Sequence, residues 1–161
     1  MPLPFPHVFL PDVTHITPEL LKTLGVSGLL LDIDGTLMQT RDTMPAQPVL
    51  DWMAQMRAHG IILYILSNNK HHDRVKAFAE AVDLPWQHLA KKPGQEGFRQ
   101  AAARLGMKPG QLAMVGDQIF TDTWGARRFG CKAILVESTD TYLWYFWPRR
   151  LAELPFRKAR R

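Results

Sequence analysis

Two patterns alternate along most of the chain. Short, nearly continuous apolar runs are typical of strands buried on both faces, and they predict strands at 28–34, 61–66, 86–89, 111–115 and 132–136. Between them, apolar residues recur every three or four positions, which predicts helices at 48–59, 72–82, 97–105 and 121–129. An earlier, shorter helix is predicted to begin after Thr17, with Pro18 as its first residue, and to end near Gly25.

The alternation of strands and helices predicts a three-layer, Rossmann-like α/β fold, in which helices cover both faces of a mostly parallel, five-stranded sheet. The prolines near the start of the chain favour an extended segment there rather than a helix. No internal repeat or linker divides the sequence, so we expect one domain over 1–161, with its core at about 26–137 and an extension at 138–161. Active sites of such folds lie beyond the carboxyl ends of the strands.

The composition is that of an ordinary globular domain. Of 161 residues, 46% are hydrophobic and 22% are charged, which argues against an intrinsically disordered chain. The apolar runs are far shorter than the roughly 18 residues that a membrane-spanning helix needs, and the first residues lack the basic and apolar regions of a signal peptide. With Cys131 as its single cysteine, the sequence points to a reducing compartment, and we expect a cytoplasmic protein.

The positive charge is concentrated at the carboxyl end. The formal net charge is +5, and residues 149–161 carry six basic residues against one acid, so the rest of the chain is balanced. The main body therefore gives no support to nucleic-acid binding. Aromatic residues accompany the basic ones within 142–161, and an anionic membrane surface attracts this combination, which predicts a peripheral contact. The alternative is a helix that packs apolar side chains on the core, namely Leu143, Trp147, Leu151 and Leu154.

Two acids follow the first predicted strand, in the sequence Asp32-Ile-Asp34-Gly35-Thr36. Because side chains alternate along an extended segment, Asp32 and Asp34 are expected on the same side. Carboxylates that lie so close repel each other unless a cation or a proton lies between them, and Mg²⁺ prefers such oxygen ligands. Gly35 allows a sharp turn that leaves the Thr36 hydroxyl free to donate. A solvated turn explains the same residues without any function.

Three further polar clusters follow later strands. Ser67-Asn68-Asn69 comes after the second strand and Lys91-Lys92 after the third, while Asp117 and Asp122 follow the fourth. Taken singly, each cluster is explained by a helix cap or a turn. Taken together, they predict a phosphate site, because small donors and a lysine hold phosphate oxygens while acids hold a cation.

In this order, the four clusters resemble the motifs of the haloacid dehalogenase (HAD) superfamily of phosphatases. The similarity extends to the YqeG-like HAD subfamily IIIA over roughly residues 9–137, and Gly-Asp-Gln-x-x-Thr-Asp at 116–122 is its most specific part. One departure is Gly35, where many YqeG-like sequences carry Asn, although Gly is common in the wider superfamily. The other matching segments are 9–12, 16–19, 66–69, 92–93 and 134–136.

The resemblance implies a role for each of these residues. Asp32 would attack phosphorus as the nucleophile and form an aspartyl-phosphate, and Asp34 would act as general acid and then as general base. Mg²⁺ would be held by the Asp32 carboxylate, the backbone carbonyl of Asp34, and Asp117. Asp122 would lie behind these ligands and orient Lys92 or a metal-bound water. The transferred phosphoryl group would be bound by Thr36, Ser67, Asn68 and Lys92.

The spacing of the motifs leaves no room for the inserted cap domain by which many members of this superfamily choose substrates. Only a helix and a loop fit between Asp34 and Ser67, and only a helix and a short strand between Ser67 and Lys92. We therefore expect an open site, which suits a bulky phosphate monoester or closure by a second copy in a homodimer. Related mitochondrial and plant proteins are phosphatidylglycerophosphate phosphatases, so the resemblance implies a phospholipid monoester such as phosphatidylglycerophosphate as substrate.

Two other classes of protein use the same residue types. Receiver domains of signalling proteins also place acids, a hydroxyl and Lys-Pro around a parallel sheet. In receivers Lys-Pro comes last, whereas here Lys92-Pro93 precedes Gly116-Asp117, so the order argues against a receiver. The remaining alternative is a non-catalytic or partner-dependent interaction protein that retains the HAD fold, although every catalytic position is filled.

Overall fold

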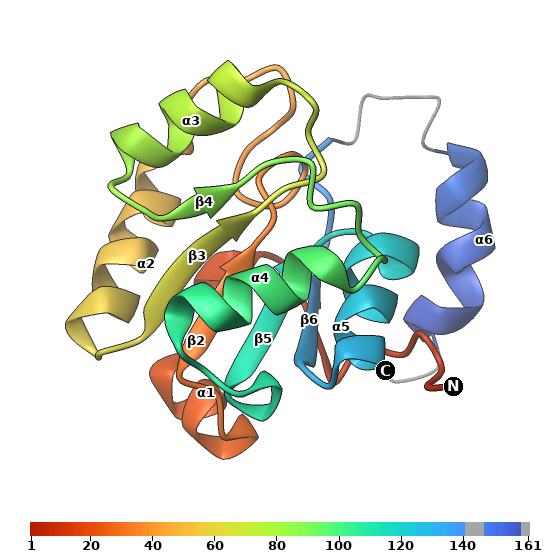
Figure 1. The fold of residues 1–161 in the computed structure, drawn as a ribbon. Helices are drawn as coiled ribbons and strands as arrows, with labels where there is room; N and C mark the ends of the chain where they lie inside the picture. The colour runs from red at the N-terminus through yellow and green to blue at the C-terminus, as the bar shows by residue number, and fades with distance from the viewer. Residues whose placement is uncertain (141–146, 159–161) are drawn as a thin grey trace.

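The computed structural model describes residues 1–140 and 147–158. In these ranges six strands form one sheet in which every pairing is parallel, in the order β1-β6-β5-β2-β3-β4. Figure 1 shows the sheet running through the molecule with helices on both sides. The strands are β1 (Val8–Leu10), β2 (Gly28–Leu31), β3 (Ile62–Leu66), β4 (Trp86–Gln87), β5 (Leu112–Gly116) and β6 (Lys132–Val136).

Strand β2 lies at the centre of the sheet, because it pairs with β3 on one side and with β5 on the other. Every residue of β2 and of β5 is buried. A strand that is covered on both faces has no solvent side, so an apolar side chain is favoured at each position. This explains why β2 and β5 stand in the sequence as continuous apolar runs.

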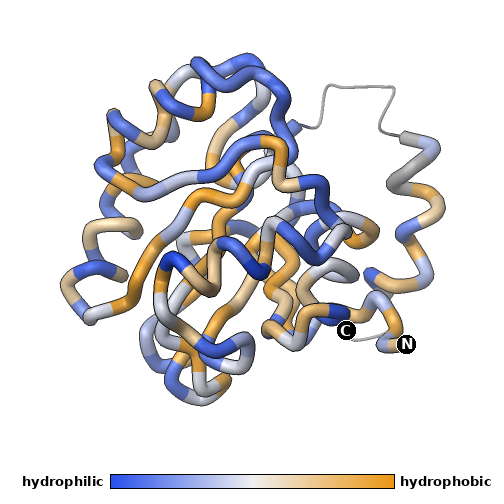
Figure 2. The backbone as a smooth tube through the Cα atoms, in the orientation of Figure 1, coloured by the Kyte–Doolittle hydropathy of each residue, from blue (hydrophilic) through white to orange (hydrophobic). Residues whose placement is uncertain are grey.

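Alternate residues of each strand pack against different layers of helices. Leu29 and Leu31 of β2 belong to one buried cluster, whereas Leu30 between them belongs to another. Figure 2 shows the hydrophobic strands, in orange, between the helices. The predicted three-layer α/β fold is therefore confirmed. The first cluster includes residues of α1 (Pro18–Leu24), α2 (Gln47–Ala58) and α3 (His72–Ala81), and the second includes residues of α4 (Glu96–Leu105) and α5 (Trp124–Phe129).

The ends of the helices follow capping signals in the sequence. The Thr17 hydroxyl accepts a hydrogen bond from the Leu20 N–H at 3.1 Å and caps α1. Gly25 ends α1 with a φ of 71°, a left-handed conformation that glycine adopts without steric cost. Two short 3₁₀ turns, η1 (Val13–His15) and η2 (Pro109–Gln111), lie between the larger elements.

The sheet has one strand more than the five that the sequence predicts. The additional strand, β1, pairs in parallel with β6 and places Val8 opposite Ile134. It lies in the proline-containing segment that was expected to be extended. Three residues are too few to show a strand pattern, and their pairing depends on the edge that β6 offers rather than on their own propensity.

The helix predicted at 121–129 begins differently in the structure. A π-helical turn, η3 (Ile119–Thr123), precedes α5, which starts at Trp124. The Gln118 carbonyl accepts from the Asp122 N–H at 3.1 Å and from the Thr123 N–H at 3.3 Å, which widens this turn. π-Turns occur frequently at functional sites, and this one carries Asp122.

The carboxyl-terminal helix, α6 (Trp147–Lys158), turns a charged residue inward rather than its leucines. Leu151 is 59% exposed and Leu154 is 40% exposed, whereas Glu153 is 2% exposed. The predicted packing of these two leucines on the core is therefore wrong. Glu153 faces inward instead, and it accepts from the Ile119 N–H at 3.0 Å. Leu143 and the side chain of Trp147 lie outside the described residues.

The described chain contains no inserted domain over the strand ends. Between β2 and β3 it forms a loop and α2, and between β3 and β4 it forms α3 with short connections. The prediction of a fold without a cap is thus confirmed for this part of the protein. No helix within 1–140 or 147–158 has the length and apolarity to cross a membrane.

Two isoleucines of β3 provide a matched test of the buried core. Ile65 is fully buried, whereas Ile62 is 43% exposed. We expect Ile65→Ala to lower the free energy of unfolding by about 2–5 kcal/mol, because it leaves a cavity. Ile62→Ala should lower it by less than about 1 kcal/mol. Urea unfolding followed by circular dichroism measures both, and equal effects would contradict the burial of these positions.

Candidate active site

The carboxyl ends of the parallel strands meet at one edge of the sheet, and the polar clusters lie there. Asp32 directly follows β2, Ser67 follows β3 and Asp117 follows β5. Beside them lies a cleft of about 150 Å³. The structure therefore brings together residues that the sequence places far apart. The cleft is lined by Asp32, Asp34, Ser67, Asn68, Asn69, Lys92, Gln118 and Thr121.

Lys92 lies at the centre of the site, with its side chain only 1% exposed. Its ammonium group donates to Asp32 Oδ1 at 3.1 Å and to Asp122 Oδ1 at 2.7 Å. Asn68 fixes the Lys92 backbone, because its side-chain amide donates to the Lys92 carbonyl at 3.0 Å and accepts from the Lys92 N–H at 2.8 Å. Asn68 thus holds Lys92 in place, and its binding of phosphate stays a prediction.

Three buried carboxylates come together beside Lys92. Oxygen atoms of Asp32, Asp117 and Asp122 all lie within 4.8 Å of one another, and these residues are 8%, 6% and 2% exposed. One ammonium group cannot balance three carboxylates when all are ionised, and the cluster then has surplus negative charge where little water reaches it. Hard oxygen donors and uncompensated negative charge favour a divalent cation, and the residues present therefore fit a metal ion.

Two glycines make room for these carboxylates. A Cβ atom at Gly116 would lie 2.2 Å from Asp122 Oδ2, and one at Gly35 would lie 2.7 Å from Asp117 Oδ2. Gly35 also has a φ of 79°, which other residues adopt only with strain. A side chain at either position would have to displace a carboxylate, so both glycines belong to the geometry of the site.

Burial governs protonation in the cluster. It raises the pKa of Asp117 to about 7, and the neighbouring charge of Asp122 acts in the same direction. It also raises the pKa of Asp32 well above its usual value, although Lys92 opposes the shift. For Lys92, burial lowers the pKa, but the charges of Asp122 and Asp32 outweigh burial and the pKa is raised. The lysine is therefore charged at neutral pH, and a cation would stabilise the ionised acids.

Asp34 has different partners. Its Oδ2 accepts from Asn69 Nδ2 at 2.7 Å, and its Oδ1 accepts from Arg74 Nη2 at 2.7 Å. Arg74 also donates to the Asp42 carbonyl at 2.9 Å. The Asp34 side chain is 22% exposed, so solvent reaches it. Sequence analysis missed Arg74, because this residue lies within α3 and not at a strand end.

The two predicted hydroxyl residues are buried at the same edge. Thr36 is 2% exposed, and its hydroxyl donates to Asp117 Oδ1 at 3.3 Å. Ser67 is 1% exposed, and its Oγ accepts from the Asn69 N–H at 3.0 Å. Ser138, which the sequence analysis missed, hydrogen-bonds to Asp117. It follows β6, so the same strand-end rule could have found it.

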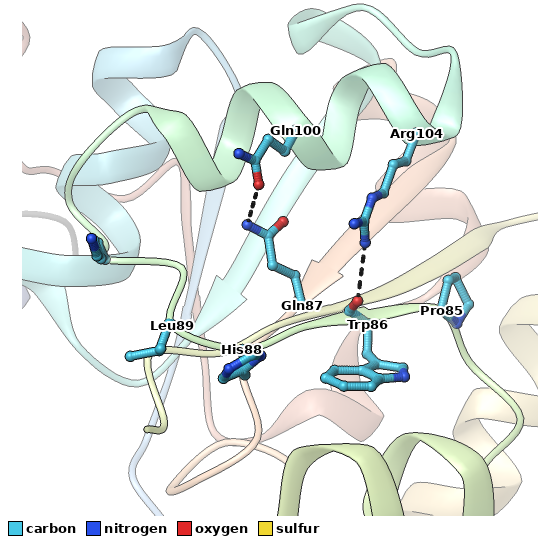
Figure 3. Close-up of a pocket in the computed structure, with 8 residues that line it drawn as sticks. Pro85, Trp86, Gln87, His88, Leu89, Gln100 and Arg104 are labelled. Carbon is cyan, nitrogen blue, oxygen red and sulfur yellow. Dashed lines mark hydrogen bonds between the residues drawn. The ribbon is translucent and has the colours of Figure 1, made fainter. Parts of the chain in front are cut away.

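A larger hollow, of about 770 Å³, lies between β4 and α4 (Figure 3). Gln87 Nε2 donates to Gln100 Oε1 at 2.7 Å across it, and Arg104 Nη1 donates to the Trp86 carbonyl at 3.3 Å. Its lining has no carboxylate and shares no residue with the lining of the cleft at Asp32. The groups suited to phosphate chemistry therefore lie in the smaller cleft.

Comparison with known proteins decides the family. Probable phosphatase YqeG of Bacillus subtilis is 35% identical to this chain over 144 residues, which cover 88% of this chain and 83% of that protein. The chain belongs to the YqeG-like phosphatases of the HAD superfamily. The sequence model of the HAD-hydrolase-like family matches residues 89–142 of this YqeG-like chain, which include Lys92 and Asp117.

A second relative of this YqeG-like phosphatase is phosphatidylglycerophosphate phosphatase 1, chloroplastic/mitochondrial, of Arabidopsis thaliana. The two are 29% identical over 167 residues, which cover 97% of this chain but only 45% of the plant protein.

Solved structures support the HAD fold. An uncharacterized protein from Listeria monocytogenes has a TM-score of 0.62 at 18% identity, over 73% of this chain and 85% of that one. The 3-deoxy-D-manno-octulosonate 8-phosphate phosphatase of Yersinia pestis has a TM-score of 0.54 at 14% identity, over 83% and 74%. At these identities the likeness concerns the fold alone.

The raised pKa of Asp117 predicts how stability depends on pH without metal. Because its pKa is about 7 in the folded protein and about 3.9 in an unfolded chain, folding favours the protonated form. This contribution is complete below pH ~4 and is lost as the pH rises through ~7, with an upper bound of about 4 kcal/mol. In EDTA, urea unfolding should show that Asp117→Asn removes this decline.

The exposed Asp51 of α2 provides the control for this measurement. Asp51→Asn should keep the pH dependence of the wild-type protein. If the free energy of unfolding of the wild type and of Asp117→Asn changed in parallel between pH 4 and pH 7, the pH dependence could not be assigned to Asp117.

Proposed function

We propose that this YqeG-like phosphatase hydrolyses phosphate monoesters in a Mg²⁺-dependent reaction that passes through an aspartyl-phosphate on Asp32. The position of the Asp32 carboxylate carries the proposal. It lines the cleft, one of its oxygens accepts from Lys92 at 3.1 Å, and it lies within 4.8 Å of the Asp117 and Asp122 carboxylates. A negatively charged nucleophile can approach a phosphate only where cations shield both groups, and this cluster is suited to hold them.

In the proposed first step, an oxygen of Asp32 attacks phosphorus, and the bond between phosphorus and the ester oxygen breaks. Asp34 donates a proton to the leaving oxygen. In the second step, Asp34 accepts a proton from the water that attacks the aspartyl-phosphate, inorganic phosphate leaves, and the Asp32 carboxylate is regenerated. Hydrogen bonds from Asn69 and Arg74, both at 2.7 Å, would orient Asp34 for the two proton transfers.

The remaining residues would bind charge. Mg²⁺ would be held by the Asp32 and Asp117 carboxylates and the backbone carbonyl of Asp34, and when bound it supplies shielding of the nucleophile and the phosphoryl oxygens. Asp122 would keep the Lys92 ammonium in place at 2.7 Å. The phosphoryl oxygens would be bound by Thr36, Ser67, Asn68 and Lys92.

Replacement of the nucleophile tests the mechanism. The purified protein should release inorganic phosphate from p-nitrophenyl phosphate with Mg²⁺ and stop when EDTA is added. Asp32→Asn should lower kcat by about a thousandfold or more, because the amide cannot form an acyl phosphate. Asp51→Asn, which changes an exposed acid of α2, should keep the wild-type rate.

Two outcomes would contradict this mechanism. Turnover that persists in Asp32→Asn or in EDTA would exclude an Asp32 intermediate or a required metal ion. Absence of phosphate release from soluble and lipid substrates by the wild-type protein would favour the non-catalytic or partner-dependent interaction protein.

For the substrate, we propose a phospholipid monoester such as phosphatidylglycerophosphate. The described residues form no cap over the cleft, so a large head group can reach Asp32. A relative named phosphatidylglycerophosphate phosphatase 1 aligns with 97% of this chain, although the chain spans 45% of that protein. Both facts favour a bulky, lipid-linked ester over a small metabolite.

The carboxyl-terminal region is the proposed contact with an anionic membrane, as a peripheral attachment of a cytoplasmic protein. Leu151 and Leu154 are exposed on α6, and five basic residues besides the inward-facing Arg157 lie between 149 and 161. Exposed apolar side chains among basic residues favour the interface of an anionic bilayer. The same leucines that fail to pack on the core are thus available to lipid.

Lipid preference and membrane binding give a further prediction. The value of kcat/KM for phosphatidylglycerophosphate in mixed micelles should exceed that for p-nitrophenyl phosphate and for a sugar phosphate by at least about tenfold. The protein should co-sediment with phosphatidylglycerol vesicles at low salt, less at high salt, and not with phosphatidylcholine vesicles. Leu151→Asp should weaken this binding.

Ile62 of β3 provides the matched control, because it is 43% exposed and lies at the opposite, amino end of the strands. Ile62→Asp should leave vesicle binding unchanged. Equal loss of binding in both variants, or equal binding to both kinds of vesicle, would exclude α6 as the membrane contact.

A further inference from the structure

Two charged side chains of α6 are buried against the body of the protein. Glu153 is 2% exposed, and the Arg157 side chain is 9% exposed. They form an ion pair at 3.2 Å, from Arg157 Nη2 to Glu153 Oε2. Burying an ion pair costs desolvation energy and adds little stability by itself. The role of these two side chains therefore depends on the further contacts that they make.

Both members of the pair hold the backbone of the segment that carries Asp117. Arg157 Nη2 donates to the Asp117 carbonyl at 2.6 Å. Glu153 Oε1 accepts from the Ile119 N–H at 3.0 Å. The first N–H groups of a helical turn have no partner within the turn, and Glu153 supplies one for Ile119. The pair thus fixes two points of the segment 117–119.

The helix is itself anchored on the far side of this segment. Arg157 Nη1 donates to Glu137 Oε2 at 3.3 Å, just beyond β6, and the Arg157 guanidinium lies 5.9 Å from the centre of the Phe9 ring of β1. The Phe156 ring contacts the rings of Phe5 and Phe120, with centroids 5.4 Å and 5.9 Å away. Figure 1 shows α6 beside η3 and the amino-terminal segment.

We propose that Glu153 and Arg157 are positioning residues that hold Asp117 in place for the metal ion. The Asp117 carboxylate lies close to Gly35 and accepts from the Thr36 hydroxyl, while Arg157 of the ion pair holds the Asp117 carbonyl. Loss of the pair would let the carboxylate sample positions that no longer converge with Asp32, and partners behind metal ligands typically change metal affinity by about 10- to 100-fold. The inference rests on the proposed function, because it takes Asp117 as a ligand.

A purely structural role for the ion pair makes a different prediction. Loss of the pair would then lower the stability and the amount of folded protein, while each folded molecule kept its metal affinity. If the pair positions Asp117, its loss weakens metal binding in folded protein and raises the Mg²⁺ concentration for half-maximal rate, whereas kcat at saturating Mg²⁺ is largely kept.

The test uses the full chain with Arg157→Met, Arg157→Lys and Glu153→Gln. Mg²⁺ affinity is measured by titration calorimetry, and Mn²⁺ affinity by electron paramagnetic resonance of the free ion, so activity is not the only readout. We expect Arg157→Met to raise the Kd for Mg²⁺ by about tenfold. Arg157→Lys should raise it less, because it keeps a donor and the positive charge.

Glu153→Gln keeps the proposal testable if Arg157→Met does not fold. Its amide oxygen can still accept from the Ile119 N–H, while the ion pair with Arg157 is lost, and we expect a rise in Kd of about threefold to tenfold. Circular dichroism and thermal unfolding confirm that each compared variant is folded.

The exposed pair of Arg99 and Glu96 on α4 supplies the matched control. Arg99→Met removes a guanidinium from an arginine–glutamate pair away from Asp117, and its Kd for Mg²⁺ should equal that of the wild type. The inference is overturned if folded Arg157→Met and Glu153→Gln bind Mg²⁺ as the wild type does, while Asp117→Asn does not bind it. The proposed metal role fails, and the inference with it, if the wild-type protein binds neither ion.

Discussion

The contacts of the Lys92 ammonium group with Asp32 and Asp122 are the interaction on which the rest of the site depends. A buried lysine is stable only when charged partners surround it, and here the carboxylates lie 3.1 and 2.7 Å away. Asp32 follows β2 and Asp122 lies in η3, so the lysine connects these two segments to the loop after β4. Asn68 then fixes the lysine backbone from the β3 loop. Without Lys92, the repulsion among the three carboxylates would have to be relieved by a metal ion or by protonation of the acids.

The parallel sheet provides the frame that this cluster needs. Parallel strands end at one edge, so residues 32, 67, 92 and 117 meet although they are distant in the sequence. The glycines at 35 and 116 admit the carboxylates at distances that no Cβ atom would allow. The π-turn η3 carries Asp122 to the same place. Helices cover both faces of the sheet, and the described residues form no inserted domain over the strand ends.

Much of this arrangement could be predicted from the sequence, because the strongest constraints are local. Continuous apolar runs mark strands covered on both faces, and the acids at 32 and 117 stand directly after them. The missed features depend on partners distant in the chain. Strand β1 has only three residues and exists through its pairing with β6, while Arg74 reaches Asp34 from within a helix. In α6, Glu153 and Arg157 face inward where leucines were expected. A periodic hydrophobic pattern cannot reveal this, because it does not show that these two side chains bond to backbone groups.

The pairing of β1 with β6 has a consequence for biosynthesis. Val8 lies opposite Ile134, so β1 finds its partner only after β6, at the other end of the described sheet sequence, has been made. Strand β2, at the centre of the sheet, likewise pairs with β5 only after β5 has been made. Such non-local pairing slows folding and leaves apolar strand edges exposed in the nascent chain. Until β6 has been made, the nascent chain can pair β2 with β3 but cannot pair β1 at the edge of the sheet.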